Sequence, residues 1–185
     1  MNNGKVVPRH TITALVQDKP GVLNRISSMF RRRGFNIASL AVGHSEMPDL
    51  SRMTFVVEGD DRVVEQMTKH LHKLIDVIKV SDISDENVVS RELALIRVKA
   101  DVETRSEIMQ TVSIFRANIV DVASDSLIVE VAGDEKKINS LHDLLRDFGV
   151  LEIMRTGTIA LNRGMWTGSQ RSRTRRQDWG EASSV

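Results

Sequence analysis

A strand, a helix and the start of a second strand are encoded in HTITALVQDKPGVLNRISSMFRRRGFNIASLAV, residues 10–42. Residues 10–16 alternate in polarity, which predicts a strand. Pro20 predicts a helix start close to it, because its fixed φ suits the first turn and its missing N–H would be unpaired there. Gly34 is a typical helix end, and the next strand opens at Asn36. The apolar stripe of this helix is Val22, Leu23, Ile26, Met29 and Phe30.

The composition is that of an ordinary intracellular protein. The chain has 185 residues, no cysteine and a net charge of +1, so it has no disulfide framework, thiolate nucleophile or thiolate metal site. No apolar run reaches the roughly 20 residues that a membrane-spanning helix needs. The first ten residues, MNNGKVVPRH, lack the apolar segment of an export signal. We therefore expect a cytoplasmic location.

The expected elements repeat along the chain. In the first half, strands are expected at 36–43, 51–58 and 75–83, with a helix before the last one. In the second half, strands are expected at 92–99, 118–123, 127–132 and 150–159, with helices through 108–115 and 138–148. Asn36-Ile37 matches Asn118-Ile119, and VEGDD (57–61) matches VAGDE (131–135). The order βαββαβ, used twice, predicts an α+β fold of two tandem ferredoxin-like domains.

The boundaries follow from the polar segments. We predict one domain at 9–84 and another at 88–163, joined by the polar segment Ser84-Asp85-Glu86-Asn87. The second half is shorter by about eight residues in its central hairpin, where 124–126 suffice for a tight turn. Residues 164–185 predict a disordered tail, because arginines there alternate with Ser, Thr, Gln and Gly. Contact of this tail with an acidic patch on a partner is an alternative.

Four segments carry a family resemblance: DKPGVLNRISSMFRRRGFNIASLAVGHSEMPDLSRMTFVVEGDD (18–61), QMTKHLHKLIDVIKV (66–80), RELALIRVKA (91–100) and IFRANIVDV (114–122). Over about residues 10–163 the chain resembles the regulatory, or small, subunits of acetohydroxyacid synthase (acetolactate synthase). The resemblance implies that the first domain is an ACT domain and that the chain has no catalytic residues. It implies a homodimer of ACT domains, a separate catalytic large subunit that is activated, and feedback inhibition by a branched-chain amino acid, usually valine. Thiamine diphosphate, magnesium and FAD are expected in that partner, and no cofactor here.

The residues themselves fit an amino-acid effector. A zwitterion needs donors for its carboxylate, acceptors for its ammonium group and a small apolar pocket. The N–H groups of Gly21 and Val22 are expected to be unpaired in the first helical turn, where an anion is favoured. Asn36 offers an amide that donates and accepts. The resemblance places the effector site at Asp18, Gly21 and Asn36, with Val22 and Ile37 beside them, between two side-by-side ACT domains.

Each of these residues also has a structural explanation. Asp18 can cap the helix, Gly21 can serve the turn, Asn36 can open a strand and Val22 can belong to the core. The family often has Asn at position 18, and the carboxylate of Asp18 would attract the ammonium group and repel the carboxylate of an effector. Three arginines, 31–33, match the dipole at the helix end, and an anion-binding patch is the alternative interpretation.

Other function classes find less support in the sequence. None of the five histidines lies in HExxH or another metal spacing, and GxGxxG, Walker A and GxSxG motifs are absent. An RNA-recognition module shares the βαββαβ order, and RGFNI (33–37) faintly resembles its RNP1 motif. However, RNP1 belongs to the third strand, where MTFVV (53–57) offers one aromatic ring. An ACT sensor for a different enzyme would have the same ligand site and another partner.

Overall fold

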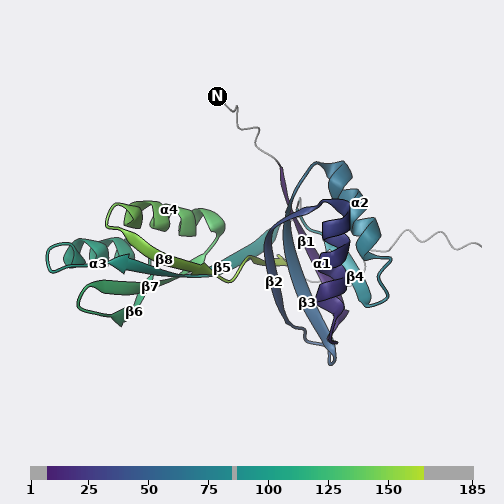
Figure 1. Ribbon diagram of the computed structural model, residues 1–185, viewed down its shortest axis with the longest axis horizontal. Helices are drawn as coiled ribbons and strands as arrows, with labels where there is room; N and C mark the ends of the chain where they lie inside the picture. Colours follow the sequence, from purple (N-terminus) through teal and green to yellow (C-terminus); the bar gives the residue numbers. More distant parts are fainter. Residues whose placement is uncertain (1–7, 85–86, 165–185) are drawn as a thin grey trace, which may run out of the picture.

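The computed structural model describes residues 8–84 and 87–164. It contains two βαββαβ units connected by one long strand (Figure 1). The first domain comprises β1 (Arg9–Gln17), α1 (Val22–Arg33), β2 (Asn36–His44), β3 (Leu50–Glu58), α2 (Asp61–Leu71) and β4 (Val77–Asp82). The second comprises β5 (Val88–Lys99), α3 (Arg105–Ile114), β6 (Asn118–Val122), β7 (Ser126–Gly133), α4 (Glu135–Arg146), β8 (Val150–Arg155) and β9 (Ile159–Asn162). This order confirms the predicted pair of tandem ferredoxin-like domains.

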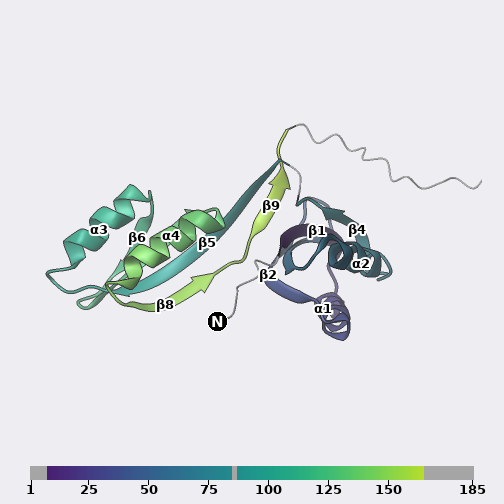
Figure 2. The same ribbon diagram turned by 90° about the horizontal axis from the view of Figure 1, so that it is seen from above.

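Each domain is an antiparallel sheet with two helices on one face. The strand order is β2-β3-β1-β4 in the first sheet and β6-β7-β5-β8 in the second. The first third of β5 extends beyond the other strands of the second sheet and pairs with β9, from Val88 opposite Asn162 to Arg91 opposite Ile159. Figure 2 shows this two-stranded ribbon reaching from the second domain to the side of the first. The strands β2 and β6 lie at corresponding edges of the two sheets.

The core of the first domain follows the predicted alternation. Ile12, Ala14 and Val16 are all buried on the helix side of β1. Phe30 of α1 stacks on Phe55 of β3, with ring centroids 5.3 Å apart, an arrangement that adds to the energy of burial. The helix stripe is correct except for Leu23, which is 46% exposed. Leu23 is therefore not a core residue, although its spacing predicted one.

The two domains repeat each other in detail. In both, the second strand has a bulge after its Asn-Ile pair, following Ile37 in β2 and Ile119 in β6. In both, an aspartate caps the second helix, Asp60 accepting from the Val63 N–H at 2.9 Å and Asp134 from the Lys137 N–H at 2.8 Å. These are the positions aligned from the sequence, so the repeat is structural as well.

Several predicted boundaries are wrong. The strand predicted at 92–99 begins at Val88, because its first four residues pair with β9. Three other boundaries differ for a backbone reason. The helix α1 begins at Val22 rather than near Pro20, because Gly21 is left-handed at φ 87° and stands outside the helix. The strand predicted at 150–159 divides into β8 and β9 where Gly157 takes φ 83°. The strand predicted from Ile75 begins at Val77, whose N–H is held in a turn by the Leu74 carbonyl. Residues 85–86 of the predicted linker and 165–185 of the predicted tail lie outside the described residues.

Candidate functional site

The turn between β1 and α1 places Asp18 beside the end of β2. The Asp18 N–H donates to the Asp49 carbonyl at 2.8 Å, which fixes the turn. Its carboxylate makes no cap on α1, whose N-cap Gly21 has no side-chain hydrogen bond. Instead, Asp18 Oδ2 lies 3.0 Å from Nδ1 of His44, the last residue of β2. The capping explanation for Asp18 is therefore wrong, and His44 is a neighbour that sequence reasoning missed.

At the start of α1, the backbone of Gly21 is accessible, whereas the N–H of Val22 is already hydrogen-bonded. No atom lies within 4 Å of the point where a Cβ on Gly21 would stand, so a ligand can approach the backbone there. The Val22 N–H donates to the Lys19 carbonyl at 3.3 Å, and the Val22 side chain is buried. The expectation of an unpaired N–H at Val22 is therefore wrong. Ile37 is partly buried and packs against the core at the Asn36 end of β2.

Asn36 lies at the opposite end of the sheet from this turn. Asn36 of β2 is paired with Glu58, the last residue of β3. On its other side, Glu58 is paired with Arg9, the first residue of β1. Asn36 Nδ2 donates to Glu58 Oε2 at 2.8 Å. Because β2 runs nine residues from Asn36 to His44, the two ends are separated by about 26 Å at the usual rise per residue. One copy of the chain therefore does not bring Asn36 together with Asp18 and Gly21.

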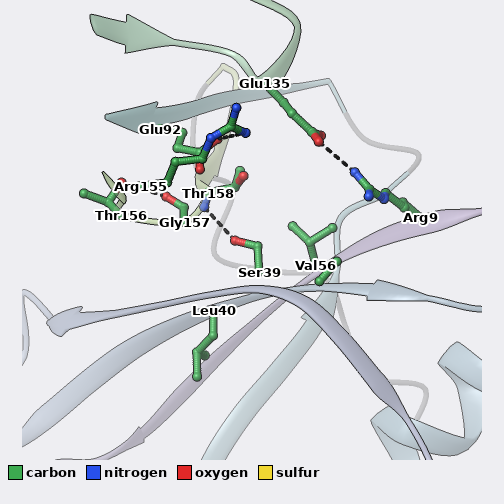
Figure 3. Close-up of a pocket in the computed structure, with 11 residues that line it drawn as sticks. Arg9, Ser39, Leu40, Val56, Glu92, Glu135, Arg155, Thr156, Gly157 and Thr158 are labelled. Carbon is green, nitrogen blue, oxygen red and sulfur yellow. Dashed lines mark hydrogen bonds and ion pairs between the residues drawn. The ribbon is translucent and has the colours of Figure 1, made fainter. Parts of the chain in front are cut away.

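Glu58 continues into a network that reaches the second domain. Glu58 Oε1 accepts from Arg9 Nε at 3.3 Å and Nη2 at 3.2 Å. Arg9 Nη1 donates to Glu135 Oε1, in the first turn of α4, at 2.7 Å (Figure 3). The hydrogen bond and charge of Glu135, followed by those of Glu58, raise the pKa of Arg9 further above its ordinary value. Sequence reasoning identified neither Arg9, Glu58 nor Glu135 as part of a site.

This network borders a pocket of about 440 Å³ between the domains. In Figure 3, Ser39 of β2 points into the pocket toward Thr158, and Leu40 points away from it. Ser39 Oγ accepts from the Thr158 N–H at 2.9 Å. Arg155 and Glu92 line the pocket from the second domain. The pocket is therefore enclosed by the open face of the first sheet and by the segment between β8 and β9.

The corresponding turn of the second domain is closed. Asp101 Oδ1 accepts from the Glu103 N–H at 3.0 Å and from the N–H and hydroxyl of Thr104, both at 2.8 Å. These hydrogen bonds, chiefly those from Thr104, lower the pKa of Asp101 below its ordinary value. The side chain of Asp101 occupies the place where an anionic ligand would meet the start of α3. The turn before α3 is therefore occupied by its own side chain, unlike the open turn at Gly21.

The arginines at the end of α1 border a second, basic concavity. It has a volume of about 320 Å³, and its charged lining includes Arg32, Arg33, His70 and Lys73. Burial lowers the pKa of His70, and the charges of Arg33 and Lys73 lower it further. The arginines lie in the last turn of the helix, where positive charge complements the dipole.

The described residues bear on three other features: a metal site, a membrane-spanning helix and an exposed aromatic ring for RNA. Within 8–84 and 87–164, no group of three His, Asp or Glu side chains could hold a metal ion. No helix in the same ranges is long and apolar enough to cross a membrane. The one aromatic ring of β3, Phe55, is fully buried against Phe30, so it cannot stack on an RNA base as RNA-recognition modules require.

Comparison with known proteins gives matches across both domains. The family model described as "AHAS small subunit-like ACT domain" matches residues 12–79, and the one described as "Small subunit of acetolactate synthase" matches residues 91–164. The "Probable acetolactate synthase small subunit" of Archaeoglobus fulgidus is 59% identical over 156 residues, covering 84% of this chain and 98% of that one. The acetolactate synthase small subunit of Mycolicibacterium smegmatis is 51% identical over 164 residues, covering 89% and 95%.

A solved structure agrees with these matches. The crystal structure of the acetolactate synthase small subunit from Thermotoga maritima has a TM-score of 0.80 and 43% sequence identity. The match covers 86% of this chain and 99% of that one. The likeness therefore extends through both domains.

Proposed function

Because the chain belongs to the family of acetolactate synthase small subunits, we propose that it is the non-catalytic regulatory subunit of an acetolactate synthase in branched-chain amino acid biosynthesis. It binds the catalytic large subunit and raises its activity. Valine, or another branched-chain amino acid, binds its ACT domain and reverses that effect. Thiamine diphosphate, magnesium and FAD belong to the catalytic partner, and the complex is cytoplasmic.

The observation that carries this proposal is the arrangement of the edge strand β2. Among the described residues, no strand pairs with its outer side, and an unpaired edge favours pairing with another strand. If two copies pair their β2 strands antiparallel about Leu40, Asn36 of one copy meets His44 of the other. His44 lies 3.0 Å from Asp18. The two separated halves of the predicted site thus come together twice in a homodimer.

The groups assembled in this way suit a zwitterion. The open backbone at Gly21, at the start of α1, favours the carboxylate of the effector. The carboxylate of Asp18 favours its ammonium group, and the amide of Asn36 can serve either. The effector joins residues from both copies, so its binding is coupled to the arrangement of the dimer. This coupling is the physical basis of the proposed feedback inhibition.

The test is reconstitution with the catalytic subunit of the same organism. Acetolactate formation is measured with and without the full-length chain across a valine titration. We expect the chain to raise the rate and valine to reverse the rise. In Asn36→Ala, the rise is kept and its reversal by valine is lost.

The second domain offers a matched control for this variant. Asn118 of β6 donates to Glu130 at 3.1 Å, as Asn36 does to Glu58, but it stands far from an open helix start. Asn118→Ala is therefore expected to keep both activation and the valine response. Absence of activation, together with absence of any valine response, would point instead to an ACT sensor for a different enzyme.

A further inference from the structure

We propose that Glu58 and Arg9 are positioning residues that transmit effector binding from Asn36 to the second domain. This inference rests on the effector role proposed for Asn36 above. It adds a route, because a ligand at the edge of the first sheet is otherwise remote from α4. The route consists of three consecutive polar contacts between side chains.

The contacts form an unbroken series. Asn36 donates to one oxygen of Glu58 at 2.8 Å, and Arg9 donates to the other oxygen at 3.2 and 3.3 Å. Arg9 uses its remaining terminal nitrogen to reach Glu135 at 2.7 Å. Glu58 and Arg9 therefore each have a defined partner on either side, and a change at one end of the series alters the partners available to the next residue.

The amide of Asn36 supplies the switch. In the free chain it donates to Glu58. An effector carboxylate, as a charged acceptor, competes with Glu58 for the same amide. When the Asn36 amide donates to the effector, Glu58 loses that hydrogen bond and keeps only the hydrogen bonds from Arg9. Arg9 then divides its donors differently between Glu58 and Glu135, which biases the position of α4.

A second contact on the same strand amplifies this effect. Ser39, three residues along β2, accepts from the Thr158 N–H at 2.9 Å. A Cβ on the neighbouring Gly157 would lie 2.9 Å from the Leu40 carbonyl oxygen, so the segment before β9 is docked closely on β2. A shift of β2 on effector binding thus reaches the second domain at two places, α4 and the segment 156–158.

The second domain provides an internal comparison. There, Asn118 also donates to a glutamate on the neighbouring strand, Glu130. The residue across from Glu130 on β5 is Leu95, whereas the residue across from Glu58 on β1 is Arg9. The Asn-to-Glu pair is therefore common to both domains, and the arginine that extends it is specific to the first. The extension is what an inter-domain route requires.

The test separates effector binding from its consequence. The dissociation constant of valine is measured by calorimetry on the full-length subunit, and valine inhibition is measured on the reconstituted enzyme. In Glu135→Gln we expect the dissociation constant to stay within twofold of wild type while the maximal inhibition falls by at least half. Glu135→Asp, which keeps the charge, restores inhibition.

The matched control is Glu152→Gln, which breaks the exposed pair of Glu152 with Arg97, 3.6 Å apart within the second domain. This variant is expected to bind valine and be inhibited as wild type is. Inhibition of Glu135→Gln equal to that of the control would overturn the proposed route and leave the proposed function standing. A wild-type enzyme that does not respond to valine would overturn both.

Discussion

Arg9 Nη1 donates a hydrogen bond of 2.7 Å to Glu135 Oε1, although the two residues are 126 positions apart in the sequence. It connects the first strand of the first domain with the first turn of α4, where a carboxylate is favoured by the helix dipole. The two side chains are 48% and 46% exposed. An ion pair so accessible to water contributes little to stability. The pair therefore fixes which groups of the two domains face each other and adds little stability.

Replacing Arg9 is expected to change stability only slightly. Arg9→Ala should lower the free energy of unfolding by less than about 1 kcal/mol, the upper range for exposed ion pairs. Urea denaturation followed by circular dichroism measures this quantity. A loss of more than about 2 kcal/mol would mean that the pair is a main source of stability, which its exposure argues against.

Gly157 should tolerate no side chain. In Gly157→Ala, the new Cβ would lie 2.9 Å from both the Leu40 carbonyl oxygen and Ser39 Oγ, and the backbone has φ 83°. We expect destabilisation by more than the roughly 1 kcal/mol of left-handed strain alone. Gly164→Ala is the control, because Gly164 has φ 88° and no neighbour within 4 Å. Equal shifts in the urea midpoint of the two variants would contradict close docking of this segment.

The stability of the first domain should depend on the ion pair between buried Asp76 and Arg25. The side chain of Asp76 is 8% exposed, and Arg25 Nε lies 2.8 Å from its Oδ2, in a geometry too poorly aligned for a hydrogen bond. Arg25→Ala leaves a buried carboxylate without a cation, at an expected cost of about 1–3 kcal/mol in unfolding free energy. Lys69→Ala, which breaks an exposed helical pair with Glu65, should have no measurable effect. The same small effect for both variants would refute this role of Arg25.

His70 should make stability depend on pH. Burial and the charges of Arg33 and Lys73 lower its pKa from the ordinary 6.5. Between the lowered and the ordinary value the unfolded chain binds more protons, so stability falls as the pH drops below 6.5. We expect His70→Gln to reduce the fall in urea midpoint between pH 7.5 and 5.5. In addition, Arg33→Gln should raise the pKa of His70 in an NMR titration; an unchanged value would contradict the assigned cause.

Much of the fold was predictable because its signals are local. Alternation predicts that Ile12, Ala14 and Val16 lie on one face, which is buried, and the Asn-Ile and Gly-Asp matches align the two domains from the sequence alone. The errors arose where one backbone angle overrides a pattern. Gly157 lies inside an apolar run that predicts one strand, and its positive φ divides that run into β8 and β9.

The candidate site was less predictable because its parts are not local. Asp18 and Asn36 are 18 positions apart, yet they lie at opposite ends of β2. Only the strand order shows that β2 is the edge strand of its sheet. The proximity of His44 to Asp18 and of Arg9 to Glu135 depends on sheet register and on domain packing. Neither relation leaves a spacing that can be read along the chain.

The most direct test of the account is a mixed dimer. Gly21→Leu, which fills the open approach, and Asn36→Ala are each prepared as full-length subunits and are each expected to lose valine binding. The two variants are then mixed so that their subunits exchange. In every heterodimer, one site receives Asn36 from the Gly21→Leu subunit and Gly21 from the Asn36→Ala subunit, and the other site carries both substitutions. Calorimetry should then recover valine binding at about a quarter of all sites. No recovery in a sample shown to contain heterodimers would mean that the site does not combine the two copies.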